Sequence, residues 1–237
     1  AYPVGALDVF NYIFHGRLMV HYQANPYVAL PIAYQQDPLL PYLVWTDWPS
    51  TYGPLWTLLS GAAALLYGGN LLLGLIVFKA LAVAFYLAAA VGLYFLLRRL
   101  GRPDPAAGTL LFAWNPLVLF ETAANAHNDI AMAFFVVLAL FALVGGRIRL
   151  ALPLLMASAL VKFLTALLFP AFLLYWLLPP GRRARLAPLL GGLGLALLLA
   201  LLFYLPFWSD TQAVQAVARR GDLFSASPAA LLAAWLR

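Results

Sequence analysis

The 237-residue chain is 65% hydrophobic and only 9% charged, and its mean hydropathy is +0.91. Soluble domains carry far more charge, so this composition excludes an ordinary soluble protein and indicates an integral membrane protein. The chain has no cysteine, which excludes disulfides and cysteine-ligated metals. The net charge of +6 does not indicate nucleic acid, because the basic residues follow apolar runs in short loops that set membrane topology.

Polar residues stand among aromatic ones in the first segment, residues 5–31. At helical spacing Asp8, Tyr12 and His15 share one face, and Asn11 lies beside them. A carboxylate at a membrane surface, backed by basic and aromatic residues, can serve as a general base. The alternative is that Asp8 caps a short helix beginning at Val9.

The next segment, residues 37–56, is dense in Pro, Trp and Tyr. Aromatic residues commonly anchor a protein at the membrane interface. Trp45, Trp48 and Tyr52 could instead line a groove for a sugar or a lipid chain, and the sequence leaves both interpretations open. The apolar run at 54–70 is too short to cross a bilayer comfortably, so it predicts an interfacial helix.

Apolar runs long enough to span a bilayer occupy residues 70–97, 107–124, 129–146 and 186–207. Basic residues cluster between these runs, and the positive-inside rule places them in the cytoplasm: Arg98, Arg99, Arg102, Arg147, Arg149, Arg182, Arg183 and Arg185. The run at 150–178 must start and end near cytoplasmic loops, so it predicts a hairpin that turns near Lys162.

The predicted organisation is therefore a single transmembrane domain over 1–237. Residues 1–69 form an extracytoplasmic loop with interfacial helices, 70–207 a transmembrane bundle, and 208–237 a second extracytoplasmic segment. The chain starts with Ala and stops as another apolar stretch begins, so we expect a fragment of a longer protein.

A polar cluster at residues 121–129 interrupts the apolar runs on the extracytoplasmic side, with Glu121, Asn125, His127, Asn128 and Asp129. Helix capping explains the two asparagines well but Glu121 and His127 poorly. A carboxylate one turn below the surface is costly in lipid and indicates function. The same reasoning applies to Lys162, which could neutralise an anionic headgroup, whereas Lys79 could snorkel or pair with a carboxylate.

Five stretches in this order resemble the membrane-embedded GT-C glycosyltransferases, most closely the polyprenyl-phosphate-mannose-dependent mannosyltransferases of glycosyltransferase family 87 and their relatives: "LDVFNYIFHGR", "ANPY", "STYGPLW", "WNPLVLFETAANAHNDIAMAFFVVLAL" and "ASALVKFLTALLFPAFLL". The resemblance implies an all-α polytopic transmembrane bundle of GT-C type with short interfacial and hairpin helices. It implies that Asp8 is the catalytic base. That family often has an acidic residue where this chain has His15.

The expected activity is transfer of a hexose, which this resemblance implies to be mannose, from a polyprenyl-phosphate donor to a hydroxyl of a glycan or glycolipid acceptor. The expected place is the extracytoplasmic face of a bacterial plasma membrane, with no cofactor, metal or nucleic acid. A lipid or glycolipid carrier or flippase is the alternative. We expect Asp8, Arg17, His127 and Lys162 to converge on one cavity, the last three binding the donor phosphate. The expected substrate-binding residues are Tyr12, His15, Asn25, Tyr52, Asn128 and Asp129.

Overall fold

The computed structural model describes residues 5–178 and 182–208, with the side chains of 182–184 left out, and this part of the chain is all-helical, without a strand. The α-helices are α1 (Asp8–Val20), α2 (Pro54–Tyr67), α3 (Leu71–Arg99), α4 (Pro105–Ala113), α5 (Pro116–Leu119), α6 (Asp129–Val144), α7 (Ile148–Val161), α8 (Phe169–Leu177) and α9 (Arg182–Tyr204). Short 3-10 helices occupy η1 (Pro31–Ala33), η2 (Leu40–Tyr42), η4 (Phe163–Leu168) and η5 (Leu205–Phe207), and η3 (Phe120–Ala124) is a π-helix.

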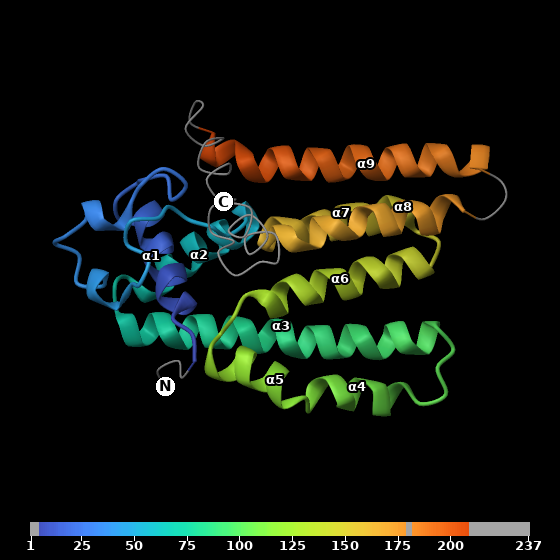
Figure 1. The fold of residues 1–237 in the computed structure, drawn as a ribbon, viewed down its shortest axis with the longest axis horizontal. Coiled ribbons are helices and arrows are strands. Elements are labelled where there is room, and N and C mark those ends of the chain that lie inside the picture. Colours follow the sequence, from blue (N-terminus) through green and yellow to red (C-terminus); the bar gives the residue numbers. More distant parts are fainter. Residues whose placement is uncertain (1–4, 179–181, 209–237) are drawn as a thin grey trace, which may run out of the picture.

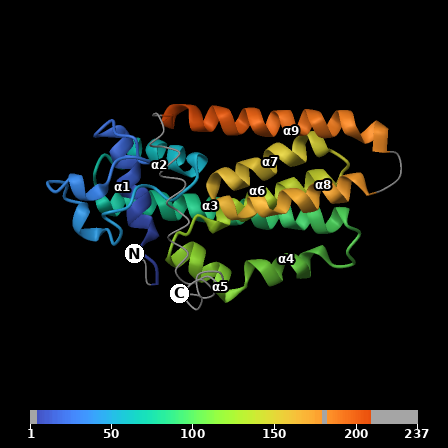
Figure 2. The same ribbon diagram turned by 45° about the horizontal axis from the view of Figure 1, so that its top comes forward.

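The long helices lie side by side along the long axis of the molecule (Figures 1 and 2). Helix α7 packs between α6 and α9, and α6 packs in turn against α3. Small buried residues allow these close approaches, including Ala139 and Ala142 on α6 and Ala151 on α7. These helices thus pack into a single apolar bundle.

Helices α1 and α2 and the loops around them gather at one end of the bundle (Figure 1). Aromatic rings fill the space between these helices and α3. The Tyr12 ring meets Trp56 edge-on at 5.1 Å between centroids and lies 5.7 Å from Phe78. All three side chains are almost fully buried, so α1 is anchored rigidly to the bundle.

The helix ends follow local sequence signals. Helix α2 begins at Pro54, whose missing N–H costs nothing in a first turn, and stops at Gly68, which adopts the left-handed φ of 54°. Helix α3 is capped by the side chain of Asn70, which accepts from the N–H of Leu73.

Most predicted spans correspond to helices, but the run at 107–124 is not a continuous one. It is divided into α4, α5 and η3. The break falls at Asn115, whose side chain caps α5, and at Pro116, which cannot continue a helix from the preceding turn. The reversal predicted near Lys162 is present, because α7 ends at Val161 and α8 runs back beside it (Figure 1).

Two of the described helices are long and apolar enough to cross a membrane, α3 and the stretch over α9 at 185–207. Only 22% and 17% of their apolar windows are buried inside the protein. A core helix of a soluble domain would be mostly buried, so these two helices point apolar surface outward.

The two ends of the bundle differ in chemistry. The end of α3, the connection between α6 and α7 and the start of α9 lie together at one end, and all three carry arginines (Figure 1). Helix α1, the start of α6 and the end of α7 lie at the other end. The polar cluster at 121–129 is therefore brought next to Asp8. The segment at 208–237 lies outside the described residues except for Trp208.

Candidate active site

Asp8 is the first residue of α1, and its carboxylate does not cap that helix. The N-cap position belongs to Leu7, and no side-chain cap hydrogen bond is present there. Instead, Oδ1 of Asp8 accepts a hydrogen bond of 2.7 Å from the hydroxyl of Tyr52, and Oδ2 lies 3.3 Å from Nε2 of His127. The capping alternative is thus wrong, and both carboxylate oxygens face polar groups from other elements.

His127 reaches Asp8 because of an unusual backbone. The π-helix η3 ends at Ala124, and Ala126 then takes a left-handed φ of 57° although it is fully buried and has a Cβ. Both features are rare and are often found at functional sites. Lys79 on α3 supports this turn by donating to the carbonyl oxygens of Ala123 and Ala124, at 3.1 and 2.8 Å.

The imidazole of His127 lies between two carboxylates. Its Nδ1 is 3.1 Å from Oε2 of Glu121, and its Nε2 faces Asp8 without the alignment of a full hydrogen bond. Asn125 donates to the same Glu121 oxygen at 3.1 Å and accepts the N–H of Gly5. Glu121 therefore orients the imidazole.

These contacts favour a charged pair. Burial raises the pKa of Asp8, but contacts with His127 and Tyr52 and the positive charge of His127 and Lys162 outweigh burial, so that pKa lies below its ordinary value. Contact with Asp8 raises the pKa of His127 against the opposing effect of burial, and Glu121 and Asp129 add to the rise. Asp8 is thus ionised and His127 readily protonated near neutral pH.

Lys162 lies at the C-terminal end of α7, beside this pair. Its Nζ donates to both carboxylate oxygens of Asp129, each at 2.8 Å. Both side chains are 43% exposed, so the ion pair is open to an incoming anion. Asp129 starts α6 without capping it, and the Asn128 side chain makes no cap bond either.

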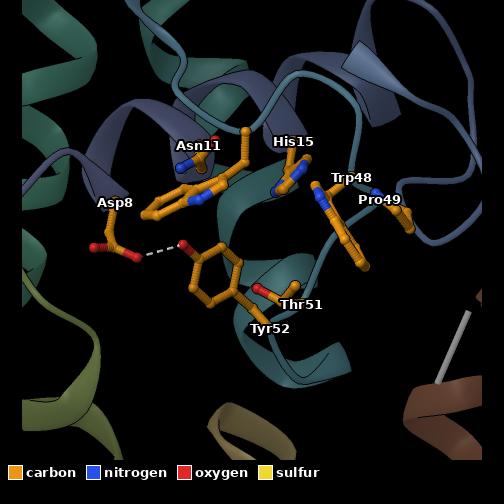
Figure 3. A pocket seen from close by; sticks show the side chains of 8 residues that line it. Asp8, Asn11, His15, Trp48, Pro49, Thr51 and Tyr52 are labelled. Atoms are coloured by element: carbon orange, nitrogen blue, oxygen red, sulfur yellow. Dashed lines mark hydrogen bonds between the residues drawn. The ribbon is translucent and has the colours of Figure 1, made fainter. Parts of the chain in front are cut away.

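Two cavities flank the Asp8–His127 pair. The first has a volume of about 230 Å³ and is lined by Asp8, Asn11, His15, Trp45, Trp48, Pro49, Thr51 and Tyr52 (Figure 3). The second, of about 260 Å³, has mostly apolar walls and is lined by Phe112, Leu117, Val118, Glu121, Thr122, His127, Asp129, Ile130, Met132 and Ala133. Asp8 borders the polar cavity, and His127 borders the apolar one.

Two of the expected substrate-binding residues, Tyr12 and Asn128, are buried behind the site and do not line its cavities. Tyr12 is 1% exposed, and its hydroxyl accepts the N–H of Asn128 at 3.3 Å while its ring meets Tyr52 edge-on. Asn128 is also 1% exposed. These two residues hold α1 against the 125–128 turn and line neither cavity.

Arg17 does not join the cluster, contrary to the expected convergence. Nine residues along α1 from Asp8, it points to the opposite face of the helix, because nine helical steps amount to about two and a half turns. There it pairs with Asp37, a carboxylate with no exposed side-chain surface, which also accepts from Tyr22. Asp37 was not predicted, since nothing in the sequence of this irregular loop indicates its position.

Asn25 also lies outside the two cavities. Its side chain donates to the carbonyl oxygen of Phe207 at 2.9 Å and accepts the N–H of Tyr27. It therefore ties the first loop to η5. Thr51, in contrast, lines the polar cavity and was not predicted, although it directly precedes Tyr52.

Within the described ranges, no group of three or more His, Asp or Glu residues is placed to hold a metal ion. The available chemistry is that of the carboxylate of Asp8 next to a histidine whose pKa is raised and a lysine. Such a set can accept a proton on one side and stabilise a phosphate on the other.

A family model described as "Alpha-(1->6)-mannopyranosyltransferase, N-terminal domain" (MptA_B family) matches residues 1–178. The matched region covers three quarters of the chain and includes every residue of the Asp8, His127 and Lys162 cluster. No curated protein and no solved structure matches the chain significantly.

Proposed function

Because the chain belongs to the MptA_B family of alpha-(1->6)-mannopyranosyltransferases, we propose that it transfers mannose from a polyprenyl-phosphate donor to a glycan or glycolipid hydroxyl at the extracytoplasmic face of a membrane. The mannosyltransferase activity follows from membership in this family. The lipid donor, the GT-C fold, the membrane face and the residue roles are our proposals.

The proposed mechanism depends on the position of Asp8. It lines the polar cavity and contacts His127, which lines the apolar cavity. Its carboxylate takes the proton of the acceptor hydroxyl as that oxygen bonds to the anomeric carbon of the donor. The bond from that carbon to the phosphate oxygen breaks on the opposite side, and the electron pair leaves with the phosphate. Attack from the opposite side inverts the anomeric centre, so an alpha product requires a beta-linked donor.

The leaving phosphate gains negative charge, which cations near the pair can stabilise. His127 and Lys162 are the groups on that side of Asp8, and both are partly exposed. We therefore keep His127 and Lys162 of the three expected phosphate-binding residues and leave out Arg17, which is held by Asp37. Asp129 and Glu121 keep these cations in place before the donor arrives.

The apolar cavity suits the lipid portion of the donor. Its walls come from α4, α5 and α6, and His127 and Asp129 stand on its border. A prenyl chain entering there would place its phosphate beside His127 and Lys162. Burial of a few isoprene units would supply binding free energy remote from the reacting carbon.

The membrane setting is supported by the outward apolar surfaces of α3 and α9, and by the collection of arginines at the end away from Asp8. The positive-inside rule then makes the arginine end cytoplasmic. Asp8, Tyr52, His127 and Lys162 would face the other side, where a flipped lipid-linked sugar is available.

The test is an assay on membranes that contain the protein, with polyprenyl-phosphate mannose labelled in the sugar and a mannoside acceptor. A transferase releases polyprenyl phosphate in step with labelled product, and the product carries a new alpha-(1->6) bond. Release of neither compound, with the labelled lipid crossing the bilayer intact, would mean that the protein is a carrier instead.

A further inference from the structure

The polar cavity contains a histidine that the mechanism above leaves unused. His15 is 5% exposed, and neither of its ring nitrogens has a hydrogen-bond partner within the described part of the chain. Figure 3 shows its ring on the wall of the cavity between Asn11 and Trp48. A buried polar group without a partner is costly, which points to a ligand that completes its hydrogen bonds.

The protonation state of His15 limits the chemistry of that ligand. Burial lowers the pKa of His15 to about 4, so the ring is neutral near pH 7. A neutral imidazole offers one donor and one acceptor, and a sugar hydroxyl can be the partner of either nitrogen. Among the residues that the structure describes, no arginine or lysine lines the cavity, and the charged residue on its wall is Asp8, so the cavity offers no cation to an anionic group.

The walls of the cavity suit a sugar ring. Trp45 and Trp48 supply apolar ring faces, and Asn11, Thr51 and His15 supply polar atoms. Trp45 is 45% exposed, an arrangement that leaves a large aromatic surface free to cover a ligand. The volume of about 230 Å³ is below the range of ~300–1,000 Å³ common for drug-sized ligands, which limits the cavity to about one hexose.

The position of the cavity relative to Asp8 indicates whether it binds the donor sugar or the acceptor sugar. Tyr52 holds Oδ1 on the side of the polar cavity, whereas Oδ2 faces His127 and the apolar cavity. The attacking hydroxyl and the leaving phosphate must lie on opposite sides of the anomeric carbon. The two cavities therefore suit the two substrates separately.

We propose that the cavity lined by Asp8, Asn11, His15, Trp48 and Tyr52 binds the terminal uncharged hexose of the acceptor, with His15 hydrogen-bonding a hydroxyl of that sugar. This assignment rests on the proposed transferase function. It makes His15 a determinant of acceptor affinity and gives it no part in donor binding.

The main experiment measures initial rates for His15→Phe while acceptor and donor are varied in turn. Loss of the hydroxyl contacts should raise the acceptor KM about tenfold and leave the donor KM within about twofold. His21→Phe is the matched control, because His21 follows the same helix and is exposed. It should change neither constant. A changed donor KM with an unchanged acceptor KM in His15→Phe would overturn the assignment.

A binding measurement covers the case in which His15→Phe folds poorly. Saturation-transfer NMR on the protein in detergent should detect methyl mannoside with wild type and with Trp48→Phe, and a much weaker signal with Trp48→Ala. Equal signals from Trp48→Phe and Trp48→Ala would contradict the stacking role. If these variants behave as wild type while Asp8→Asn abolishes transfer, the cavity assignment fails and the proposed function stands.

Discussion

Lys162 and Asp129 join the end of α7 to the start of α6 through two hydrogen bonds of 2.8 Å. This ion pair holds the positive charge of Lys162 near Asp8. The arginine-rich ends of the helices lie at the opposite end of the bundle. Replacement of Lys162 by Met should raise the donor KM about tenfold or more, because the phosphate would then meet an unpaired Asp129. Lys162→Arg keeps the charge and should retain most of the affinity.

The check is initial rates against donor concentration for wild type, Lys162→Met and Lys162→Arg. An unchanged donor KM in Lys162→Met would remove this residue from the phosphate site.

The Asp8–His127 pair predicts a bell-shaped pH profile for kcat/KM. Activity should fall in acid as Asp8 is protonated, below the ordinary carboxyl pKa because its pKa is lowered. It should fall in base as His127 loses its proton, above the ordinary value of 6.5 because its pKa is raised. In His127→Gln the basic limb should disappear, and the acid limb should move to higher pH because the effect of burial on the pKa of Asp8 is then offset only by Tyr52 and Lys162.

Profiles of wild type and His127→Gln over the range in which the protein stays folded provide the measurement. An acid limb that stays in place or moves to lower pH would contradict the coupling.

Arg17 should matter for stability rather than for the donor. Removal of its guanidinium leaves the carboxylate of Asp37 buried and unpaired, a change that typically costs ~3–5 kcal/mol. Arg17→Met should therefore lower the thermal midpoint in detergent by several degrees, while the donor KM of the folded fraction stays near wild type. The double variant Arg17→Met, Asp37→Asn should recover part of the loss. A raised donor KM with unchanged stability would show that Arg17 binds the donor phosphate.

Gly53 holds the loop that carries Tyr52 against the end of α7. Its N–H donates to the carbonyl oxygen of Val161 at 3.0 Å, and a Cβ at this position would lie 2.0 Å from the carbonyl oxygen of Leu160. Gly53→Ala should push Tyr52 and Lys162 apart, lower the thermal midpoint and reduce kcat. Gly194→Ala is the control, since no atom of the described residues lies within 4 Å of a Cβ at this position, and it should be neutral. A wild-type kcat in Gly53→Ala would show that this close approach does not position the site.

The positions of the helices were largely predictable, because apolar runs of span length have few alternative structures. The break at Asn115 and Pro116 was missed, since the apolar residues continue through it, although both residue types signal a helix start. The helical spacing of Asp8 and His15 correctly placed both on one cavity. The same spacing could not show that Tyr12 is buried beneath them, because that depends on packing against Trp56 and Phe78.

The pairings between distant elements were the least predictable part. Glu121 with His127 and Asp129 with Lys162 depend on a π-helix and a left-handed Ala126, neither of which has a reliable sequence signal. Arg17 illustrates the opposite case, because its position nine residues after Asp8 was sufficient to exclude a shared helix face.

We propose that Asp8 accepts the proton of the acceptor hydroxyl, and this role can be measured by single-turnover transfer with Asp8→Asn. The asparagine is nearly isosteric and can still accept the Tyr52 hydrogen bond, so binding of both substrates should persist. Asp104→Asn, at the arginine end, is the matched control because asparagine can still cap α4. We expect a rate at least ~100-fold below wild type for Asp8→Asn, because a general base usually contributes that much, and a normal rate for Asp104→Asn. A transfer rate for Asp8→Asn within a few-fold of wild type would show that Asp8 is not the base.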